Sequence, residues 1–96
     1  MKLSEQEIEQ RLAGLPGWNH AGGQLVRRFT ARSFPHAIAL VVMAGTFAET
    51  ADHHPDITIR YTSVTMELST HSEGGVTEKD FALARKMNEA FLGLAD

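Results

Sequence analysis

The sequence predicts an α+β fold: a four-stranded antiparallel sheet with three helices on one face, in the order α-β-β-α-β-β-α. Two observations predict it. Apolar and polar residues alternate with the period of a strand in two pairs of segments, and each pair is joined by a short turn. Residues at helical spacing precede, separate and follow these pairs. Two hairpins separated by a helix favour an antiparallel sheet with its apolar face covered by the helices.

The first helix begins at a capping box. Ser4 is the predicted N-cap, with Glu7 three residues later. Ile8, Leu12 and Leu15 follow at helical spacing, and the glycines and proline around Leu15 predict the end of the helix.

The first hairpin follows this helix. An extended segment begins at Trp18, and Ala21-Gly22-Gly23 is typical of a hairpin turn. After it, two sets of residues alternate with the period of a strand: Leu25, Arg27, Phe29 and Ala31, and between them Val26, Arg28, Thr30 and Arg32. We expect Trp18 to lie in the core or at an interface.

The second helix is predicted over residues 34–52. Ser33 can cap it, and Pro35 is tolerated in a first helical turn. The run has a broad apolar face and ends before Pro55. Because the residue before a proline avoids the helical region, His54 is expected just past the last turn.

The second hairpin and the last helix complete the chain. Residues 57–61 and 64–69 alternate as two strands joined by a tight turn near Thr62-Ser63, and Gly74-Gly75 predicts a loop. Thr77 is the predicted N-cap of the final helix. Its apolar residues are Phe81, Leu83, Ala84, Met87, Phe91 and Leu94.

Composition narrows the class of protein. The chain has 96 residues, so we expect one domain over residues 1–96. A core of this size is modest, which makes oligomerisation a plausible source of stability. The net charge is −3, from nine Lys and Arg against twelve Asp and Glu, and no basic patch stands out. Nucleic-acid binding is therefore not expected.

Features that the sequence lacks bear on the cellular compartment of the protein. It has no cysteine, which excludes disulfides and thiolate metal sites and fits a reducing compartment. The N-terminus lacks the apolar run of a signal peptide, and no apolar stretch approaches the roughly 20 residues that span a bilayer. We expect a soluble cytoplasmic protein with no membrane partner.

Three of the five histidines fall in two short segments. His53 and His54 lie between Glu49 and Pro55, and His71 follows the last strand. Histidine suits proton transfer because its unperturbed pKa lies nearest neutral pH. Glu49 precedes His53 by four residues, so its carboxylate can orient that imidazole. The pattern predicts an acid–base site if the end of the second helix lies beside the end of the last strand.

These residues also have plainer interpretations. Adjacent histidines are typical of a solvated helix terminus, where they favour the helix dipole. His71 alone fits a surface loop, and Glu49 alone fits a surface carboxylate. Asp80, the third residue of a capped helix, stands where acids are common.

A metal site is the weaker rival. Zinc enzymes commonly offer His-Glu-x-x-His or three well-spaced ligands, whereas adjacent histidines on one helix rarely bind one ion together. We therefore expect no metal site. His20 and His36 have no partner pattern, and we predict that both lie on the surface.

Several motifs taken together resemble the pterin-4a-carbinolamine dehydratase (4a-hydroxytetrahydrobiopterin dehydratase) family. The resemblance covers about residues 3–94, and its specificity lies in the combination of motifs. The motifs are Ala48-Glu49-x-Ala51-Asp52-His53-His54-Pro55, Tyr61-x-x-Val64, and Leu68-Ser69-Thr70-His71-x-x-Gly74-Gly75-x-Thr77-x-x-Asp80, with Gly17-Trp18, Arg28-Phe29, Phe34, Phe47 and Leu83-Ala84.

The resemblance implies both a fold and an activity. The implied fold is again four antiparallel strands with three helices on one face. The implied activity is that of a hydro-lyase, which dehydrates 4a-hydroxytetrahydropterin to quinonoid dihydropterin and so recycles the cofactor of aromatic amino-acid hydroxylases. It further implies no cofactor beyond the pterin substrate, a homo-oligomer (dimer or tetramer), and a functional link to such a hydroxylase.

The resemblance also implies site residues. The catalytic histidines would be His53, His54 and His71, and Glu49 and Asp80 match supporting polar positions at or near the site. The pterin site would be lined by Asp52, His53, His54, Ser69, Thr70, His71 and Ser72. One departure is Ile57, where many members have a tryptophan two residues after the proline. We expect it to change affinity and to leave the proton-transfer groups intact.

Two other classes of function stay open. One is an oligomeric protein-binding or regulatory module of the same fold, since some relatives also act as transcriptional cofactors. The other is a metal-dependent hydrolase, which would lose activity on chelation. The intact histidine trio favours the dehydratase.

Overall fold

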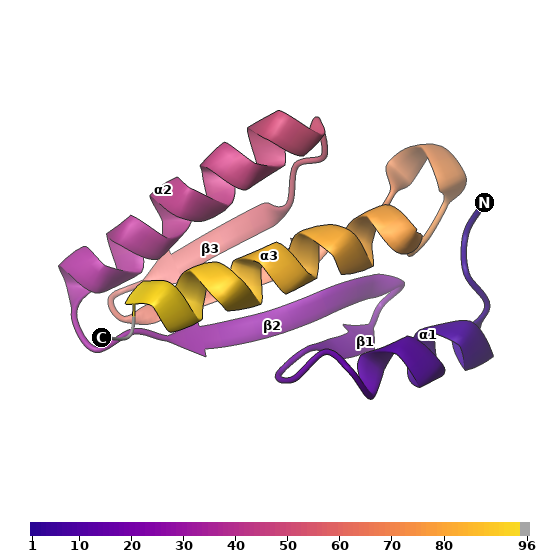
Figure 1. Cartoon of the computed structure of the whole chain (residues 1–96), viewed down its shortest axis with the longest axis horizontal. Coiled ribbons are helices and arrows are strands. Elements are labelled where there is room, and N and C mark those ends of the chain that lie inside the picture. The colour runs from indigo at the N-terminus through magenta and orange to yellow at the C-terminus, as the bar shows by residue number, and fades with distance from the viewer. Residues whose placement is uncertain (95–96) are drawn as a thin grey trace.

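The computed structural model describes residues 1–94 and confirms the predicted order of elements (Figure 1). The helices and strands are α1 (Glu5–Leu12), β1 (Asn19–Ala21), β2 (Gln24–Thr30), α2 (Phe34–Ala51), β3 (Asp56–Arg60), β4 (Ser63–Leu68) and α3 (Glu78–Leu94). A short 3-10 turn, η1 (His71–Glu73), was not predicted. It occupies the segment where the sequence indicated only a loop.

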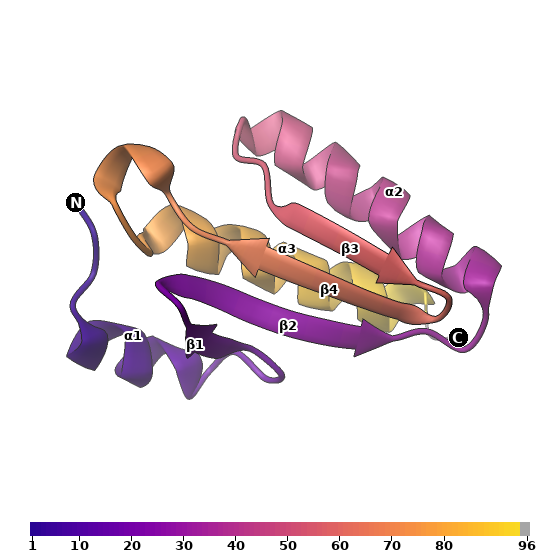
Figure 2. The same cartoon turned by 180° about the vertical axis from the view of Figure 1, so that it is seen from behind.

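The sheet is antiparallel throughout, with the strand order β1-β2-β4-β3. Figure 1 shows α2 and α3 in front of the sheet and α1 beside β1, and Figure 2 shows the opposite face of β2, β3 and β4 without a helix over it. The predicted fold class is therefore confirmed, with β3 and β1 as the two edge strands.

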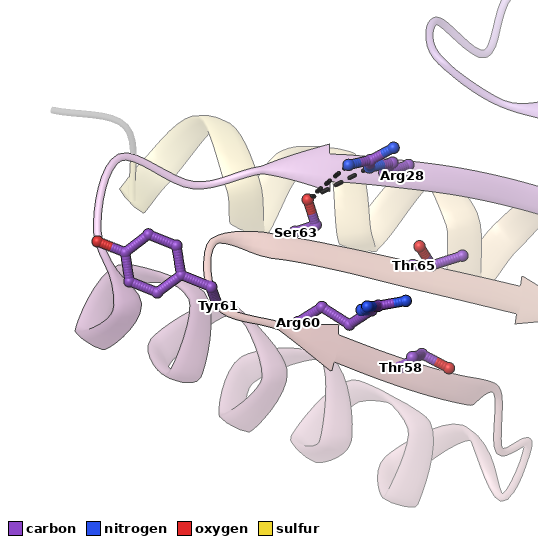
Figure 3. A pocket seen from close by; sticks show the side chains of 6 residues that line it. All are labelled: Arg28, Thr58, Arg60, Tyr61, Ser63 and Thr65. Atoms are coloured by element: carbon purple, nitrogen blue, oxygen red, sulfur yellow. Dashed lines mark hydrogen bonds between the residues drawn. The ribbon is translucent and has the colours of Figure 1, made fainter.

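Strand alternation divides the sheet into a buried and an open face. Leu25 and Phe29 of β2 and Val64, Met66 and Leu68 of β4 are almost fully buried beneath the helices. Their sequence neighbours Val26 and Arg28 of β2 and Ser63, Thr65 and Glu67 of β4 point to the open face, because successive side chains of a strand alternate. Figure 3 shows that open face near the β3–β4 turn.

Local signals set the ends of the elements. Ser4 and Glu7 form the predicted capping box of α1, and Ser33 accepts a hydrogen bond from the His36 backbone N–H at the start of α2. Gly22 and Gly23 both take positive φ angles, of 60° and 76°, in the β1–β2 turn. Glycine adopts this region without steric cost, which explains the tight turn.

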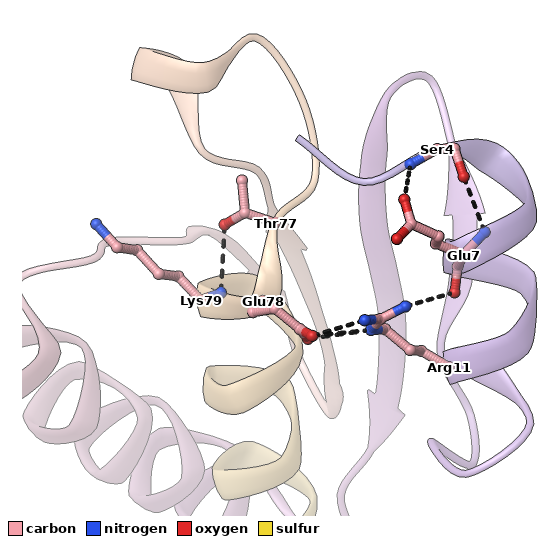
Figure 4. Close-up of polar contacts among 6 residues, drawn as sticks. All are labelled: Ser4, Glu7, Arg11, Thr77, Glu78 and Lys79. Carbon is pink, nitrogen blue, oxygen red and sulfur yellow. Dashed lines mark hydrogen bonds and ion pairs between the residues drawn. The ribbon is translucent and has the colours of Figure 1, made fainter. Parts of the chain in front are cut away.

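The first helix is shorter than its apolar spacing suggests. It ends at Leu12, so Leu15 lies beyond it, although the Leu15 side chain is buried. An ion pair holds this helix to α3: Arg11 donates from Nε and Nη2 to the Glu78 carboxylate, at 2.7 Å for Nη2 to Oε2 (Figure 4).

Trp18 lies in the core, as expected. Its ring meets the Phe29 ring edge-on, with centroids 6.1 Å apart, and its Nε1–H donates to Asn88 Oδ1 at 2.7 Å. Arg27 donates to the same oxygen at 2.6 Å and lies over the Phe29 ring. These contacts anchor the first hairpin against α3.

His36 is not the surface residue that the sequence predicted. Its side chain is only 9% exposed, and its Nδ1 accepts a hydrogen bond from the Arg32 backbone N–H. The ring stacks on Phe91 of α3, with centroids 6.0 Å apart. A contact between residues so far apart in sequence leaves no periodic signal, which is why the pattern missed it.

We expected no apolar stretch long enough to span a bilayer, but α2 meets that criterion. By length and composition alone this 18-residue helix, with a mean hydropathy of 1.3, could also cross a membrane. In the folded chain it packs against α3, with Ala37, Leu40, Ala44 and Ala48 buried. One face of α2 is thus covered by the rest of the chain, while only 28% of the helix is buried.

Candidate active site

The end of α2 directs His53 toward α3. Asp52, the residue after the helix, has a φ of 50°, in the left-handed region that aspartate tolerates better than most residues. The His53 backbone N–H then closes the helix by donating to the Ala48 carbonyl oxygen at 3.0 Å. This reversal turns the His53 side chain inward, where it is 12% exposed.

The partner of His53 is Asp80, at the start of α3. His53 Nε2 lies 2.5 Å from Asp80 Oδ1, and the Asp80 side chain is fully buried. With the Asp80 carboxylate as the acceptor, His53 Nε2 donates the shared hydrogen. The Nδ1 atom of His53 is then the ring nitrogen left for a substrate.

Two threonines complete the hydrogen bonding of Asp80. Its Oδ2 accepts from the Thr70 hydroxyl and from the Thr77 backbone N–H, both at 2.9 Å. The two threonine hydroxyls are themselves 2.7 Å apart. A buried carboxylate costs least when its oxygens are paired in this way. Asp80 is thus held from the segment after β4, from the residue before its own helix and from the segment after α2.

Asp80 plays two roles that the sequence offered as alternatives. It caps α3 as the third residue after Thr77, whose hydroxyl in turn accepts from the Lys79 backbone N–H at 3.2 Å (Figure 4). It also orients a predicted catalytic histidine. The sequence did not single out Thr77 as part of this network, although the spacing of Thr77 and Asp80 contained the signal.

The expected pairing of Glu49 with His53 is wrong. Glu49 Oε1 instead lies 2.9 Å from His54 Nε2, and both side chains are largely exposed. The helix stops before His53, so the four-residue spacing of a regular helix no longer applies there. The two adjacent imidazoles consequently face different surroundings.

His71 directly follows Thr70, which donates a hydrogen bond to Asp80. It begins η1 directly after the buried Thr70, and its side chain is exposed, as is that of Ser72, whereas Ser69 is half-buried. Within residues 1–94 the His71 ring makes no hydrogen bond or ion pair. The ends of α2 and β4 therefore meet through Asp80, with His53 joined to Thr70 by the same carboxylate.

Separate hollows flank this network. His53 lines one of about 160 Å³ with Ala51, Lys79, Ala82, Leu83 and Lys86. His71 lines another of about 340 Å³ with Ser69, Gln24 and the glycines of two turns. Lys79 and Lys86 were not among the predicted site residues, because the exposed face of a helix carries lysines in most proteins.

Metal ligation is the rival chemistry that the histidines suggest. Among residues 1–94, no group of three or more His, Asp or Glu side chains is arranged to hold a metal ion. The polar contacts of His53 and Asp80 are hydrogen bonds to each other and to the threonines.

Comparison with known proteins connects this geometry to a family. The model of the pterin 4 alpha carbinolamine dehydratase family matches residues 1–90. The chain belongs to this family. A relative from Roseiflexus sp. (strain RS-1) that bears the family's name is 50% identical over 92% of this chain and 95% of its own length. One from Sulfolobus acidocaldarius, similarly named, is 46% identical over 93% of this chain and 98% of its own length.

Solved structures agree with this membership. A protein from Brucella melitensis, described as a transcriptional coactivator/pterin dehydratase, is 37% identical, with a TM-score of 0.90 over the whole of both chains. A pterin dehydratase-like protein described as a RuBisCO assembly factor in the alpha-carboxysome has a TM-score of 0.69 at 22% identity, over 78% of this chain and 89% of its own. That second likeness shows the fold alone.

Proposed function

We propose that this protein dehydrates 4a-hydroxytetrahydropterin to quinonoid dihydropterin by histidine acid–base catalysis. Family membership supports the substrate class. The observation that carries the chemistry is the buried pair of His53 and Asp80 at the junction of α2 and α3. A histidine with one ring nitrogen held by a carboxylate has a defined tautomer and orientation, as proton transfer requires.

The proposed reaction is the loss of water from the pterin ring. The hydroxyl on C4a leaves as water after it accepts a proton, the lone pair of a ring nitrogen assists, and a ring N–H proton is released. One imidazole gives the first proton and another group takes the second, so the reaction needs no cofactor. His53 is the best-positioned proton carrier, and His54 and His71 are proposed as the further acid–base and pterin-holding groups.

The proposed pterin site lies around the end of α2 and the segment after β4. Asp52, His53 and His54 come from the first, and Ser69, Thr70, His71 and Ser72 from the second. Asp80 supports His53, and Glu49 supports His54. After a separate two-electron reduction to the tetrahydropterin, the product would serve again as the cofactor of an aromatic amino-acid hydroxylase.

The test follows the decay of freshly made 4a-hydroxytetrahydropterin by absorbance. The wild-type protein should accelerate it. His53→Ala should lower kcat/KM by on the order of a hundredfold or more, and His71→Ala should also lower it. His20→Ala, a histidine of β1 outside the proposed site residues, is the matched control and should retain activity. Full activity in both His53→Ala and His71→Ala would contradict the proposal.

A second candidate function is an oligomeric regulatory module. The likeness to the coactivator/dehydratase of Brucella melitensis supports it, as does an exposed apolar stripe on α2. The activity of the wild-type protein distinguishes the two candidate functions. A protein that assembles but leaves the decay of the carbinolamine unchanged would favour the module.

A further inference from the structure

The open face of the sheet has a hollow of its own. It measures about 800 Å³ and is lined by Arg28, Thr58, Arg60, Tyr61, Ser63 and Thr65 (Figure 3). Small-molecule sites commonly enclose roughly 300–1,000 Å³. The hollow lies toward the Arg60 end of β3, whereas His53 precedes the opposite end of that strand, so it is distinct from the candidate active site.

Strand register brings two arginines to this hollow with hydroxyls between them. Arg28 of β2 pairs with Thr65 of β4, which pairs with Thr58 of β3. In the next row of the same face, Ser63 of β4 pairs with Arg60 of β3. The central strand thus places hydroxyl groups between guanidiniums from both of its neighbours.

The protein holds one guanidinium and leaves the other available. Arg28 donates from Nε and Nη2 to Ser63 Oγ, at 3.3 and 3.0 Å, which leaves its Nη1 donors for a ligand. Arg60 is exposed and makes no hydrogen bond or ion pair within residues 1–94. Its guanidinium carries five N–H donors in a fixed planar fork.

The charges around the hollow favour a compact anion. Among residues 1–94, no carboxylate forms an ion pair with Arg28 or Arg60. Asp56 and Glu67, paired in the row beyond Thr58 and Thr65, are the acids on this face. They would repel a long polyanion laid along the strands, and the net charge of −3 acts in the same direction.

We propose that this hollow binds the phosphate group of a small phosphorylated molecule. Two guanidiniums and three hydroxyls supply more donors than the oxygens of a single carboxylate accept, and arginine pairs bidentately with phosphate. Tyr61 at the rim is 75% exposed, with one ring face stacked on Phe34. The other face of the ring is available to the organic part of the ligand.

The test is a titration of the ¹⁵N-labelled protein followed by backbone and arginine side-chain NMR. Inorganic phosphate, pyrophosphate and acetate are added separately at constant ionic strength, with chloride as the balancing anion. Phosphate and pyrophosphate should give saturable shifts at Arg28, Arg60 and Thr65, and acetate should bind more weakly. Shifts that fail to saturate, or acetate binding as tightly as phosphate, would overturn the proposal.

Variants test whether the NMR chemical-shift changes arise from phosphate binding in this hollow. Arg60→Gln should weaken phosphate binding by roughly tenfold or more, because it removes a charge-assisted contact, and Arg60→Lys should recover part of it. Arg85→Gln removes the same charge from the exposed surface of α3 and should leave affinity unchanged. Arg60 is exposed and makes no hydrogen bond or ion pair with the described residues 1–94, so its replacement should spare the fold, which circular dichroism checks. Equal affinity in Arg60→Gln and wild type, or equal loss in Arg85→Gln, would contradict the proposal.

Discussion

At the scale of single residues, burial gives residues of the same chemical type different roles. Asp80 and Glu78 are both acids in the first turn of α3. Asp80 is fully buried and holds His53, whereas Glu78 is exposed and pairs with Arg11. Their sequence positions alone give both the same helix-dipole role. The direction of each side chain decides which of them can serve the candidate site.

Asp80→Asn should impair catalysis more than folding. The amide keeps an acceptor for the Thr77 N–H but removes the negative charge from His53. We expect kcat/KM to fall by on the order of a hundredfold, because a reacting group loses its fixed orientation. The pH–rate profile should change shape, which a purely structural role would not produce.

Glu78→Gln is the matched control for this variant. It changes another carboxylate of the same helical turn, so any general effect of charge at the helix start appears in both variants. Comparable losses of kcat/KM in the two variants, or an unchanged pH–rate profile in Asp80→Asn, would remove Asp80 from its positioning role.

Gly17 supports the hairpin that carries Trp18. Its φ is 87°, and an added Cβ would lie 2.6 Å from Arg27 Nε. Gly17→Ala should therefore lower the free energy of unfolding by roughly 1–3 kcal/mol, from backbone strain and a displaced Arg27. Urea unfolding measures this. Gly14→Ala, where the nearest atom is 3.9 Å away, should be nearly neutral, and similar losses at both positions would contradict the strain argument.

At the scale of elements, a polar contact fixes α1 to the helix that carries Asp80. Arg11 reaches across to Glu78, and the hydrogen bond from its guanidinium lowers the pKa of that carboxyl below its ordinary value of 4.5. The backbone N–H of Ser4 likewise lowers the pKa of Glu7 in the capping box. Both carboxylates therefore favour the folded state while ionised.

Acid should weaken this link between α1 and α3. A carboxyl with a lowered pKa in the folded state stabilises above its unfolded pKa, and the contribution is lost as pH falls through the folded value. We expect Arg11→Gln to lose less stability than wild type between about pH 6 and pH 3. Urea unfolding across this range measures the difference, which salt should reduce.

Arg60→Gln serves as the control for this acid prediction, since it removes an arginine that has no carboxylate partner in residues 1–94. Its pH dependence should match that of wild type. If Arg11→Gln followed the wild-type curve as well, the ion pair with Glu78 would have no part in acid stability.

At the scale of the whole molecule, α2 presents an apolar stripe to solvent. Phe34, Ile38 and Val42 are 46%, 41% and 62% exposed, and they recur every four residues along one face of the helix. Gly45 follows one turn later, exposed and with nothing within 4 Å of an added Cβ. An uncharged stripe with a small residue lets a second copy of the helix approach without like-charge repulsion.

We therefore expect this protein to form a homo-oligomer, a dimer or a tetramer, through α2. Val42→Glu should shift the assembly toward monomers, because a charge would be buried at the contact. Sedimentation velocity measures the change. Leu92→Glu, at a residue of α3 that is 68% exposed, is the control and should leave assembly intact. A monomeric wild-type protein, or unchanged assembly in Val42→Glu, would contradict the prediction.

Local patterns predicted most of the fold. The capping box at Ser4, the glycines at 22 and 23 and the strand alternation around Met66 all act within a few residues of themselves, so each could be read along the chain. The exceptions are elements whose ends depend on packing. The end of α1 at Leu12 and the turn η1 after Thr70 had no clear local signal.

The sequence by itself determined the elements, their order and the residue types of the candidate site. Only the tertiary structure decided which carboxylate pairs with which imidazole. His53 pairs with Asp80, which lies 27 residues later in the sequence, and His54 pairs with Glu49. The reason is physical. Helix caps and strand periods follow from the local backbone, whereas a side-chain pair between distant residues exists only where the end of α2 packs against the start of α3.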